Sequence, residues 1–478
     1  MEKLKTFWTE ITEKNILLPK RTGLVLVPEY YIAIVLFLYP LFFSEDRILL
    51  VFNQKTFIFC VLTICAALCC IGLYGRKTFP VKICLSWADI LLAVAVIVLV
   101  IWAFVKIFHS DMSYEQEAFL WCLIASFFLL KVFGRREGSY LNLFLFSAIF
   151  ICIDSIVYIL SGTDFFLGVS AMFEPPQDAS SYFLLASCTA SVLYCNEKRK
   201  RWGKFYLLAS LIGYIALLLH KDIVSACLLG LFLLCIPIAF SPAISLVRQN
   251  LFLCFAFLFI MSSTPLLQYI IDGISQNEQY DLSYSVYIDL FLASAGVCIC
   301  QYWEKVPKDR DPDRVLMKRF QKWYRRAAAF VLFILTAVVL TGNRMEGITD
   351  RFGIKTLKVF AASMQSSISS AESFYQQLLE NYGVVGCFLW GFLSVLFLEK
   401  IIKAWRNADI VRKQYLSLSV LFLVQTLFYR LQPVNTPAFV VLLALALSEK
   451  KTDISIAEKP DAQRLSHQDQ AMHEKGDL

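Results

Sequence analysis

The sequence from 342 to 386 reads GNRMEGITDRFGIKTLKVFAASMQSSISSAESFYQQLLENYGVVG and leads into the apolar run CFLWGFLSVLFL at 387–398. In its first half, apolar residues recur at steps of three and four, the spacing of one helix face that is narrow enough to lie on a bilayer surface. A second helical segment starts near Ser370 and continues into the apolar run. The stretch therefore predicts a charged outer loop, with a surface amphipathic helix, that feeds a membrane-spanning helix. The residues of the surface face are Ile354, Leu357, Phe360, Met364 and Ile368.

The composition of the whole chain is typical of an integral membrane protein. Of its 478 residues, 58% are hydrophobic, 15% are aromatic and 41 are Phe, with a mean hydropathy of +0.61. Soluble domains rarely combine these values. The formal charge of +7 does not indicate a nucleic-acid partner, because the cations fall in short loops between apolar runs. No cleavable signal is expected, since the first apolar run is long enough to span.

The apolar runs predict an all-α transmembrane bundle of about 12 to 14 spans, because each crossing needs about 20 residues. The cationic loops all fall on one side of this alternation, which places both termini in the cytoplasm and the 342–386 loop outside. The candidate spans are 24–44, 56–75, 87–108, 117–134, 141–160, 180–196, 205–220, 223–241, 251–272, 286–303, 327–342, 384–402, 415–429 and 433–448.

Three parts of the chain follow from this pattern. Residues 1–23 form a cytoplasmic N-terminal segment, 24–448 the membrane domain, and 449–478 a polar tail without aromatics that is expected to be disordered. The basic run 305–326 is interpreted as an orientation signal, with an anionic-lipid contact as the alternative. The fifteen cysteines lie mostly in apolar runs and the four histidines lack metal-ligand spacing, so neither a metal, a cofactor nor a disulfide framework is expected.

Charges inside apolar runs are rare and usually functional. Glu29, Asp89, Lys131 and Asp289 lie near span ends, where snorkelling to the interface explains them. Asp154 lies deeper, and it either lines a cavity or bonds a neighbouring helix. The absence of charge at span centres argues against an ion-coupled transporter.

The outward loops carry a separate set of cations. Lys221 lies in a tight turn, His220-Lys221-Asp222, and Arg430 opens the loop RLQPVNTP. With Arg344 and Arg351 of the large loop, they form a cationic set on the side where positive charge is disfavoured. Such a set suits a lipid-linked diphosphate, because guanidinium groups bind phosphate oxygens bidentately. For each cation alone, a lipid-headgroup contact is the alternative.

Several of these stretches resemble one known family, the O-antigen ligase and Wzy-type O-antigen polymerase superfamily. Residues 371–386, AESFYQQLLENYGVVG, are similar to the family's A-H-N-x-Y/F-L-Q-x-x-x-E-x-G-x-x-G stretch. Residues 350–358 resemble the segment that opens its large outer loop, and 173–182 resemble its F-x-N-P-N-x-x-A-x-Y turn. His220-Lys221 stands where many members have Ser-Arg. The likeness covers about residues 140–400.

The resemblance implies a GT-C-like membrane glycosyltransferase that needs no metal. It would transfer a glycan from an undecaprenyl-diphosphate carrier to a hydroxyl of a second glycan or a lipid, in cell-surface polysaccharide biosynthesis at the cytoplasmic membrane. The family histidine, its proposed base, corresponds here to Glu372, and the family arginine of the short turn corresponds to Lys221. A glutamate accepts a proton from a sugar hydroxyl when a membrane-proximal pocket raises its pKa.

The resemblance also implies roles for the remaining residues. Lys221, Arg344, Arg351 and Arg430 would bind the diphosphate, while Tyr375 and Gln376 would pack or bind sugar. For Glu372 the alternative to a general base is an acid at a helix start, favoured by the helix dipole. For Arg351 it is an ion pair within the loop.

Two rival functions remain open from the sequence. A flippase or exporter of lipid-linked oligosaccharide has a similar number of spans, although related halves and a central polar cavity are expected of a transporter. A non-catalytic member that acts as an assembly scaffold, with other polysaccharide-assembly proteins as partners, is consistent with the missing family histidine.

Overall fold

The computed structural model describes part of the chain, and the statements below concern that part. The described residues are 27–42, 47–49, 52–75, 94, 97–98, 101, 114–161, 177–220, 222–240, 244–275, 290–299, 322–324, 326, 374–406, 408–429 and 433–448.

Apart from turns and short connections, the described chain is helical, with one short antiparallel strand pair, β1 (Arg47–Leu49) with β2 (Phe52–Asn53). The first helical stretch consists of α2 (Val27–Ala33), the π-helical segment η2 (Ile34–Leu38) and α3 (Tyr39–Leu41). The other labelled helices are α4 (Gln54–Gly75), α6 (Tyr114–Phe133), α7 (Ser139–Ser161), α9 (Gln177–Asn196), α10 (Lys200–Leu219), α11 (Ile223–Ala239), α12 (Ile244–Ser275), α17 (Phe374–Arg406), α18 (Ile410–Gln425) and α19 (Thr436–Leu447).

The predicted membrane character is supported by five described helices that are long and apolar enough to cross a bilayer. Shorter apolar helices accompany them, such as Val224–Ala239 and Thr436–Leu447. The expected total of about 12 to 14 spans stays a prediction. The surface helix at 354–368 and the tail at 449–478 lie outside the described residues. The five spans are Gln54–Gly72, Ser139–Ser161, Lys200–Leu219, Ser245–Ser263 and Val384–Arg406.

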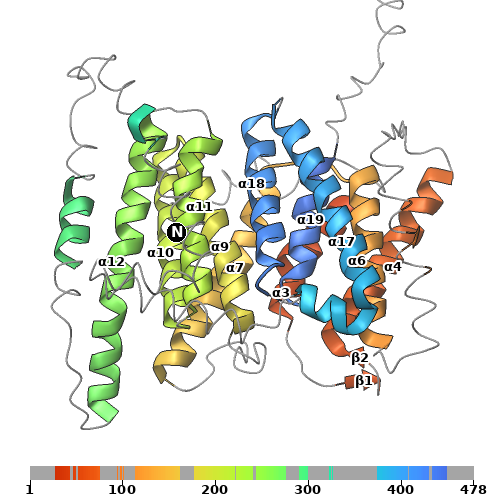
Figure 1. Ribbon diagram of the computed structural model, residues 1–478, viewed down its shortest axis with the longest axis horizontal. Helices are drawn as coiled ribbons and strands as arrows, with labels where there is room; N and C mark the ends of the chain where they lie inside the picture. Colours follow the sequence, from red (N-terminus) through yellow and green to blue (C-terminus); the bar gives the residue numbers. More distant parts are fainter. Residues whose placement is uncertain are drawn as a thin grey trace, which may run out of the picture.

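Short connections make the helices antiparallel neighbours, as Figure 1 shows for α9, α10 and α11. At one end lie the connections 134–138 and 197–199 and residues 408–409, and we call it the basic end because its residues include Arg136, Lys198, Arg199 and Arg412. The opposite end holds the turn 220–222, the start of α9 and the segment after α18. The structure thus brings together at one end His220, Asp222 and Tyr429, which are the described sequence neighbours of Lys221 and Arg430.

The pair α9 and α10 is packed closely through small residues. A Cβ atom added at Gly213 would lie 2.6 Å from Ser187 Oγ and 3.3 Å from Ser187 Cα. Ser187, Ala190 and Ser191 of α9 are buried, and Ser191 Oγ lies 2.7 Å from the Tyr214 hydroxyl of α10. Because apolar burial does not drive association in lipid, close backbone approach and interhelical hydrogen bonds hold such pairs together.

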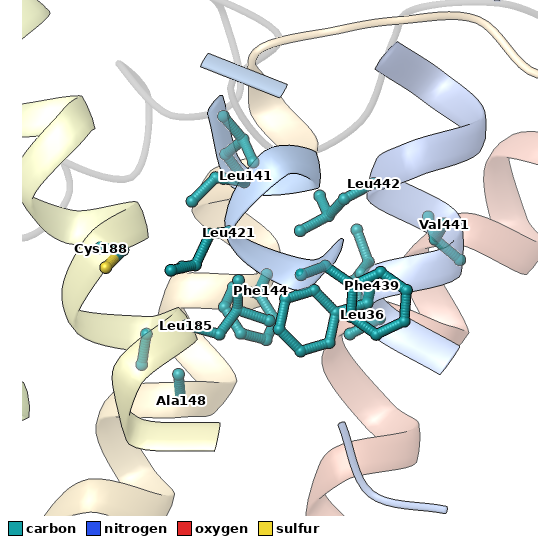
Figure 2. Packing of buried hydrophobic residues seen from close by; sticks show 14 of the residues in the cluster. Leu36, Leu141, Phe144, Ala148, Leu185, Cys188, Leu421, Phe439, Val441 and Leu442 are labelled. Atoms are coloured by element: carbon teal, nitrogen blue, oxygen red, sulfur yellow. The ribbon is translucent and has the colours of Figure 1, made fainter. Parts of the chain in front are cut away.

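The core lies where η2, α7, α9, α18 and α19 meet (Figure 2). Phe422 and Phe439 stack with ring centroids 4.4 Å apart, and Phe144 packs edge-on against Tyr182 at 5.8 Å. Leu36 is fully buried in the same cluster. This interlocking of side chains fixes which helices are neighbours.

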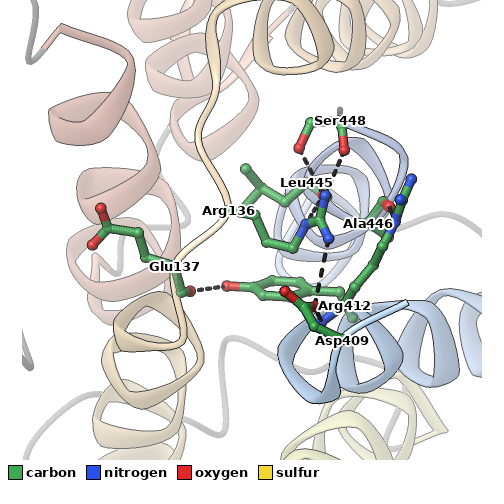
Figure 3. Close-up of polar contacts among 8 residues, drawn as sticks. Arg136, Glu137, Asp409, Arg412, Leu445, Ala446 and Ser448 are labelled. Carbon is green, nitrogen blue, oxygen red and sulfur yellow. Dashed lines mark hydrogen bonds and ion pairs between the residues drawn. The ribbon is translucent and has the colours of Figure 1, made fainter. Parts of the chain in front are cut away.

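At the basic end, two arginines donate to the last carbonyl groups of α19 and to that of its C-cap residue, Ser448 (Figure 3). Arg136 donates to Leu445 O at 3.1 Å and to Ser448 O at 2.6 Å, and Arg412 donates to Ala446 O at 3.2 Å. These carbonyls have no partner within the helix, and cations complement the negative end of the helix dipole. Burial and the neighbouring Arg412 lower the pKa of Arg136. This cluster is a structural cap for α19.

Candidate functional site

The site is built on the tight turn between α10 and α11, at the end opposite the basic loops. His220 ends α10, and Asp222 is the N-cap of α11. Asp222 Oδ1 accepts from the Val224 backbone N–H at 3.1 Å, and Oδ2 accepts from Ser225 Oγ at 2.8 Å. Aspartate is favoured at this position because its carboxylate pairs with amide groups that the helix leaves free. Hydrogen bonds of Asp222 to the first turn of α11 therefore fix the residue that follows Lys221.

A residue far away in sequence completes this network. The Tyr429 hydroxyl, just after α18, donates to Asp222 Oδ2 at 2.5 Å and lies 2.6 Å from Ser225 Oγ. Ser225 is fully buried and Tyr429 is 7% exposed. Burial, and then the Asp222 carboxylate, raise the pKa of Tyr429 well above its usual value, so the hydroxyl keeps its proton. The contact ties the 220–222 turn to the segment that continues into Arg430.

His220 joins two further helices to the turn. Its Nε2 lies 2.8 Å from Ser155 Oγ of α7, and its ring centroid lies 5.1 Å from that of Phe183 in α9. Burial lowers the pKa of His220 to about 4, although the nearby Asp222 acts in the other direction. The imidazole is therefore neutral at neutral pH.

The start of α9 contacts the segment between α18 and α19. Gln425 Nε2 donates to the Ser181 carbonyl at 3.1 Å, and Asn435 Nδ2 donates to Ser181 Oγ. On the other side of this segment, the Tyr39 hydroxyl donates to Pro433 O at 2.5 Å. Residues 430–432 thus connect two points, Tyr429 and Pro433, that are each fixed by hydrogen bonds.

Most of the predicted site residues lie outside the described part of the chain. Lys221 and Arg430 are themselves outside it, but their neighbours His220, Asp222 and Tyr429 are described and lie together. Tyr375 and Gln376 lie in the first turn of α17, where the structure does not describe their side chains. The others that lie outside the described residues are Arg344, Arg351 and Glu372.

The roles of Asp222 and Tyr429 were missed by sequence reasoning, although two local signals pointed to them. An aspartate directly before an apolar helix indicates an N-cap, and Tyr429 directly precedes a predicted phosphate-binding cation. Lys55 was also missed. It lies in the first turn of α4, is 7% exposed, and its Nζ is 5.6 Å from the ring centroid of Tyr39. It is a buried lysine at the end opposite the basic loops.

The structure shows the burial of two charged residues, Glu29 and Asp154, that the sequence placed inside apolar runs. Glu29 is 4% exposed, so the interpretation that it snorkels to the interface is wrong for this residue. Its place near the start of the candidate span 24–44 suggested an interfacial carboxylate, but the helices packed against α2 enclose it. Asp154 is fully buried beside Ser155 and so belongs to the interior of the bundle.

Among the described residues, no group of three or more His, Cys, Asp or Glu side chains is arranged to hold a metal ion. The described cysteines are free thiols. The described residues at this end supply a carboxylate, an imidazole, hydroxyls and amides.

No protein-family model matches the chain, and no curated protein or solved structure matches it. The family resemblance described above therefore depends on its motifs alone.

Proposed function

We propose that the chain is a polytopic membrane glycosyltransferase of the O-antigen polymerase or ligase type. It would transfer glycan units from an undecaprenyl-diphosphate-linked donor to an acceptor hydroxyl of a glycan or lipid, at the outer face of the cytoplasmic membrane. The end opposite the basic loops would face outward, as the positive-inside rule expects.

The observation that carries this proposal is the contact between Tyr429 and Asp222. It joins two residues that are 207 positions apart in sequence. Lys221 directly precedes Asp222 in the sequence, and Arg430 directly follows Tyr429. Cations at this end have no role in orienting the chain, so a bound anion is the better reason for their presence. A diphosphate between two convergent segments would be held by lysine as a point charge and by arginine through its planar fork.

The proposed reaction is a direct displacement at the anomeric carbon. Glu372 would remove the proton of the acceptor hydroxyl, and the acceptor oxygen would replace the carrier diphosphate on the sugar. Lys221, Arg351 and Arg430 would stabilise the negative charge that develops on the leaving diphosphate. The roles of Glu372 and Arg351 follow from the motif resemblance.

The test is turnover of carrier-linked glycan by the purified protein in lipid nanodiscs. We expect Lys221→Gln and Arg430→Gln each to lower kcat/KM by roughly tenfold or more, because each removes a charge that stabilises the leaving group. Arg351→Ala and Glu372→Gln are expected to abolish product while the protein remains folded.

The matched control is Arg199→Gln at the basic end, a cation with a half-exposed side chain that pairs with Glu197 at 3.8 Å. It should leave turnover unchanged. Full turnover in both Lys221→Gln and Arg430→Gln would remove the proposed site. Deletion of the gene separates the two activities, since single repeat units on the carrier would indicate a polymerase and long unattached chains a ligase.

A further inference from the structure

A group of exposed cations lies at the basic end, on the connection between α9 and α10 and on the first turns of α10. We call this group the basic patch, and its members are Lys198, Arg199, Lys200, Arg201 and Lys204, all with exposed side chains. Within the stretch 197–204 the only acidic residue is Glu197, which pairs with Arg199 at 3.8 Å. One carboxylate cannot neutralise the patch, so the surface is strongly positive.

This concentration of positive charge is unfavourable for the helix that carries it. Lys200 and Lys204 are four residues apart on α10, so their side chains share one face and repel each other. They also lie at the start of the helix, where the dipole disfavours cations, and the first turn contains no acidic residue. Arg136 and Arg412, by contrast, use their charge within the protein to cap α19. An anion bound at the basic patch would offset both unfavourable effects.

The exposed face of α10 shows at what depth of a bilayer the patch lies. Lys200 and Lys204 are followed on this face by Leu208, which is 57% exposed. Successive residues on the face are about 6 Å apart along the helix axis. The helix is long and apolar enough to span a bilayer, so an exposed leucine on it contacts hydrocarbon. The two lysines, one and two turns before it, therefore lie at the depth of the lipid headgroups.

A second basic and aromatic segment, far away in sequence, is held at the same end of the bundle. The Tyr324 hydroxyl accepts from Asn250 Nδ2 of α12 at 3.0 Å, and it lies near the thiol of Cys195 in the last turn of α9. The adjacent Trp323 is 69% exposed. Exposed tryptophan is typical of the membrane–water interface, so this segment also lies at headgroup depth. Its exposed cations are Lys322 and Arg326.

We propose that the basic patch, together with Lys322 and Arg326, binds the phosphate headgroups of anionic phospholipids in the leaflet around the basic end. Ammonium and guanidinium groups both bind phosphate oxygens, and clusters of basic residues next to a membrane span attract anionic lipid. Lipid fits this surface better than a soluble acidic partner does, because Leu208 and Trp323 expose apolar side chains beside the cations. The interaction is independent of the proposed transfer reaction, which concerns the opposite end of the bundle.

The experiment measures lipid binding to the full-length protein by native mass spectrometry from detergent micelles. The probes are phosphatidylglycerol, which is anionic, and phosphatidylcholine, which is zwitterionic. We expect wild type to prefer phosphatidylglycerol by roughly tenfold or more, and the double variant Lys200→Gln/Lys204→Gln to bind it roughly 20-fold more weakly, because each basic residue near anionic lipid contributes about fivefold. Affinity for phosphatidylcholine should stay within about twofold of wild type in this variant. Lys200→Arg/Lys204→Arg keeps both charges and should bind phosphatidylglycerol as wild type does.

The matched control is Lys403→Gln/Arg406→Gln, which removes two exposed cations from the last turn of α17, where Glu399 pairs with Lys403. Its affinity for phosphatidylglycerol should stay within about twofold of wild type, because those cations do not belong to the patch. Equal affinity of wild type for the two lipids overturns the proposal, as does unchanged phosphatidylglycerol binding in Lys200→Gln/Lys204→Gln. An equal loss in the control would show an effect of net charge alone and also overturns the site. Displacement of the lipid by inorganic phosphate at constant ionic strength would assign the patch to a soluble anion instead.

Discussion

Asp222 shows how one side chain organises the opposite end of the bundle. Its two carboxylate oxygens cap α11, bond Ser225 and accept from Tyr429. A charged acceptor makes hydrogen bonds about twice as strong as neutral ones, so this residue holds both the turn and the incoming segment. Lys221 and Arg430 adjoin these two anchor points in sequence.

The first prediction concerns Tyr429→Phe, which removes the hydroxyl and keeps the ring. We expect the free energy of unfolding to fall by about 1.5–3 kcal/mol, the range for a hydrogen bond to a charged group. Donor affinity should fall as well, because the segment before Arg430 loses its bond to the 220–222 turn. Thermal unfolding in detergent and donor titration measure the two effects.

Tyr415→Phe is the matched control for that prediction. Its hydroxyl donates to Glu137 O at 2.6 Å, at the basic end, so the substitution removes a buried tyrosine bond far from the proposed site. It should lower stability and leave donor affinity unchanged. Equal donor affinity in wild type and Tyr429→Phe would show that the bond between Tyr429 and Asp222 does not contribute to donor binding.

The second prediction concerns pH and His220. Burial holds the pKa of this histidine at about 4 in the folded chain, against an ordinary value of 6.5. Between these values the unfolded chain binds the proton and the folded chain does not, so stability rises with pH over this interval. We therefore expect this contribution to be lost progressively as the pH falls from about 6.5 towards 4. Unfolding temperature measured against pH tests it.

His220→Gln supplies the comparison, because glutamine keeps a polar group near Ser155 but does not titrate. The variant should show a smaller fall in unfolding temperature between neutral and mildly acidic pH. Identical pH profiles for the two proteins would contradict a buried, neutral imidazole.

At the scale of elements, hydropathy located most of the described helices but not their ends. The candidate span 141–160 became Ser139–Ser161, while 205–220 became Lys200–Leu219. Apolar runs mark only the part of a helix that lies in hydrocarbon, whereas α10 continues through Lys200 and Arg201 into the charged connection. The second helical segment of the 342–386 stretch and the span after it form one continuous helix, α17.

The end of α18 was predicted less well, and the reason is tertiary. The apolar pattern extended the span 415–429, but the helix runs from Ile410 to Gln425. The chain leaves the helix at Thr426, and Tyr429 then bonds Asp222. No local signal such as glycine or proline interrupts the sequence there, so the pattern could not predict this exit.

The third prediction concerns the contact between α9 and α10. In Gly213→Ala the added methyl group would lie too close to both the side chain and the backbone of Ser187. We expect the two helices to move apart and the free energy of unfolding to fall by about 1–3 kcal/mol, as for other overpacked sites. Thermal unfolding in detergent measures the change.

Gly203→Ala on the same helix is the control. An added Cβ there meets nothing within 4 Å, and alanine favours helix, so this variant should be neutral or slightly more stable. If both variants behave alike, close packing at Gly213 does not limit the stability of the bundle.

At the scale of the molecule, the bundle has chemically distinct ends. Arg136, Arg199 and Arg412 lie at the basic end, and the Asp222 network lies at the other. The fourth prediction follows from the positive-inside rule, which places the basic end in the cytoplasm. A protease site inserted at 197–199 should be cut in inverted vesicles and protected in intact cells.

An insertion directly after Ser161 is the counterpart, and it should be cut in intact cells because α7 ends at the opposite end of the bundle. Cleavage of the 197–199 insertion in intact cells would show that the protein has the opposite orientation in the membrane. The proposed site would then face the cytoplasm, where it could not receive an outward-facing carrier-linked glycan.

The sequence by itself indicated a helical membrane protein, located most of the helices that the structure describes, and predicted which loops share a side. These properties depend on local composition, namely the length of apolar runs and the bias of Lys and Arg between them. The tertiary structure alone decided that the 220–222 turn, the segment after α18 and the first turns of α9 meet. Helix neighbours are chosen by complementary surfaces, such as Gly213 against Ser187, and by bonds between residues as distant as Asp222 and Tyr429. No local sequence pattern encodes that choice, because complementary packing depends on both surfaces, which are far apart in sequence.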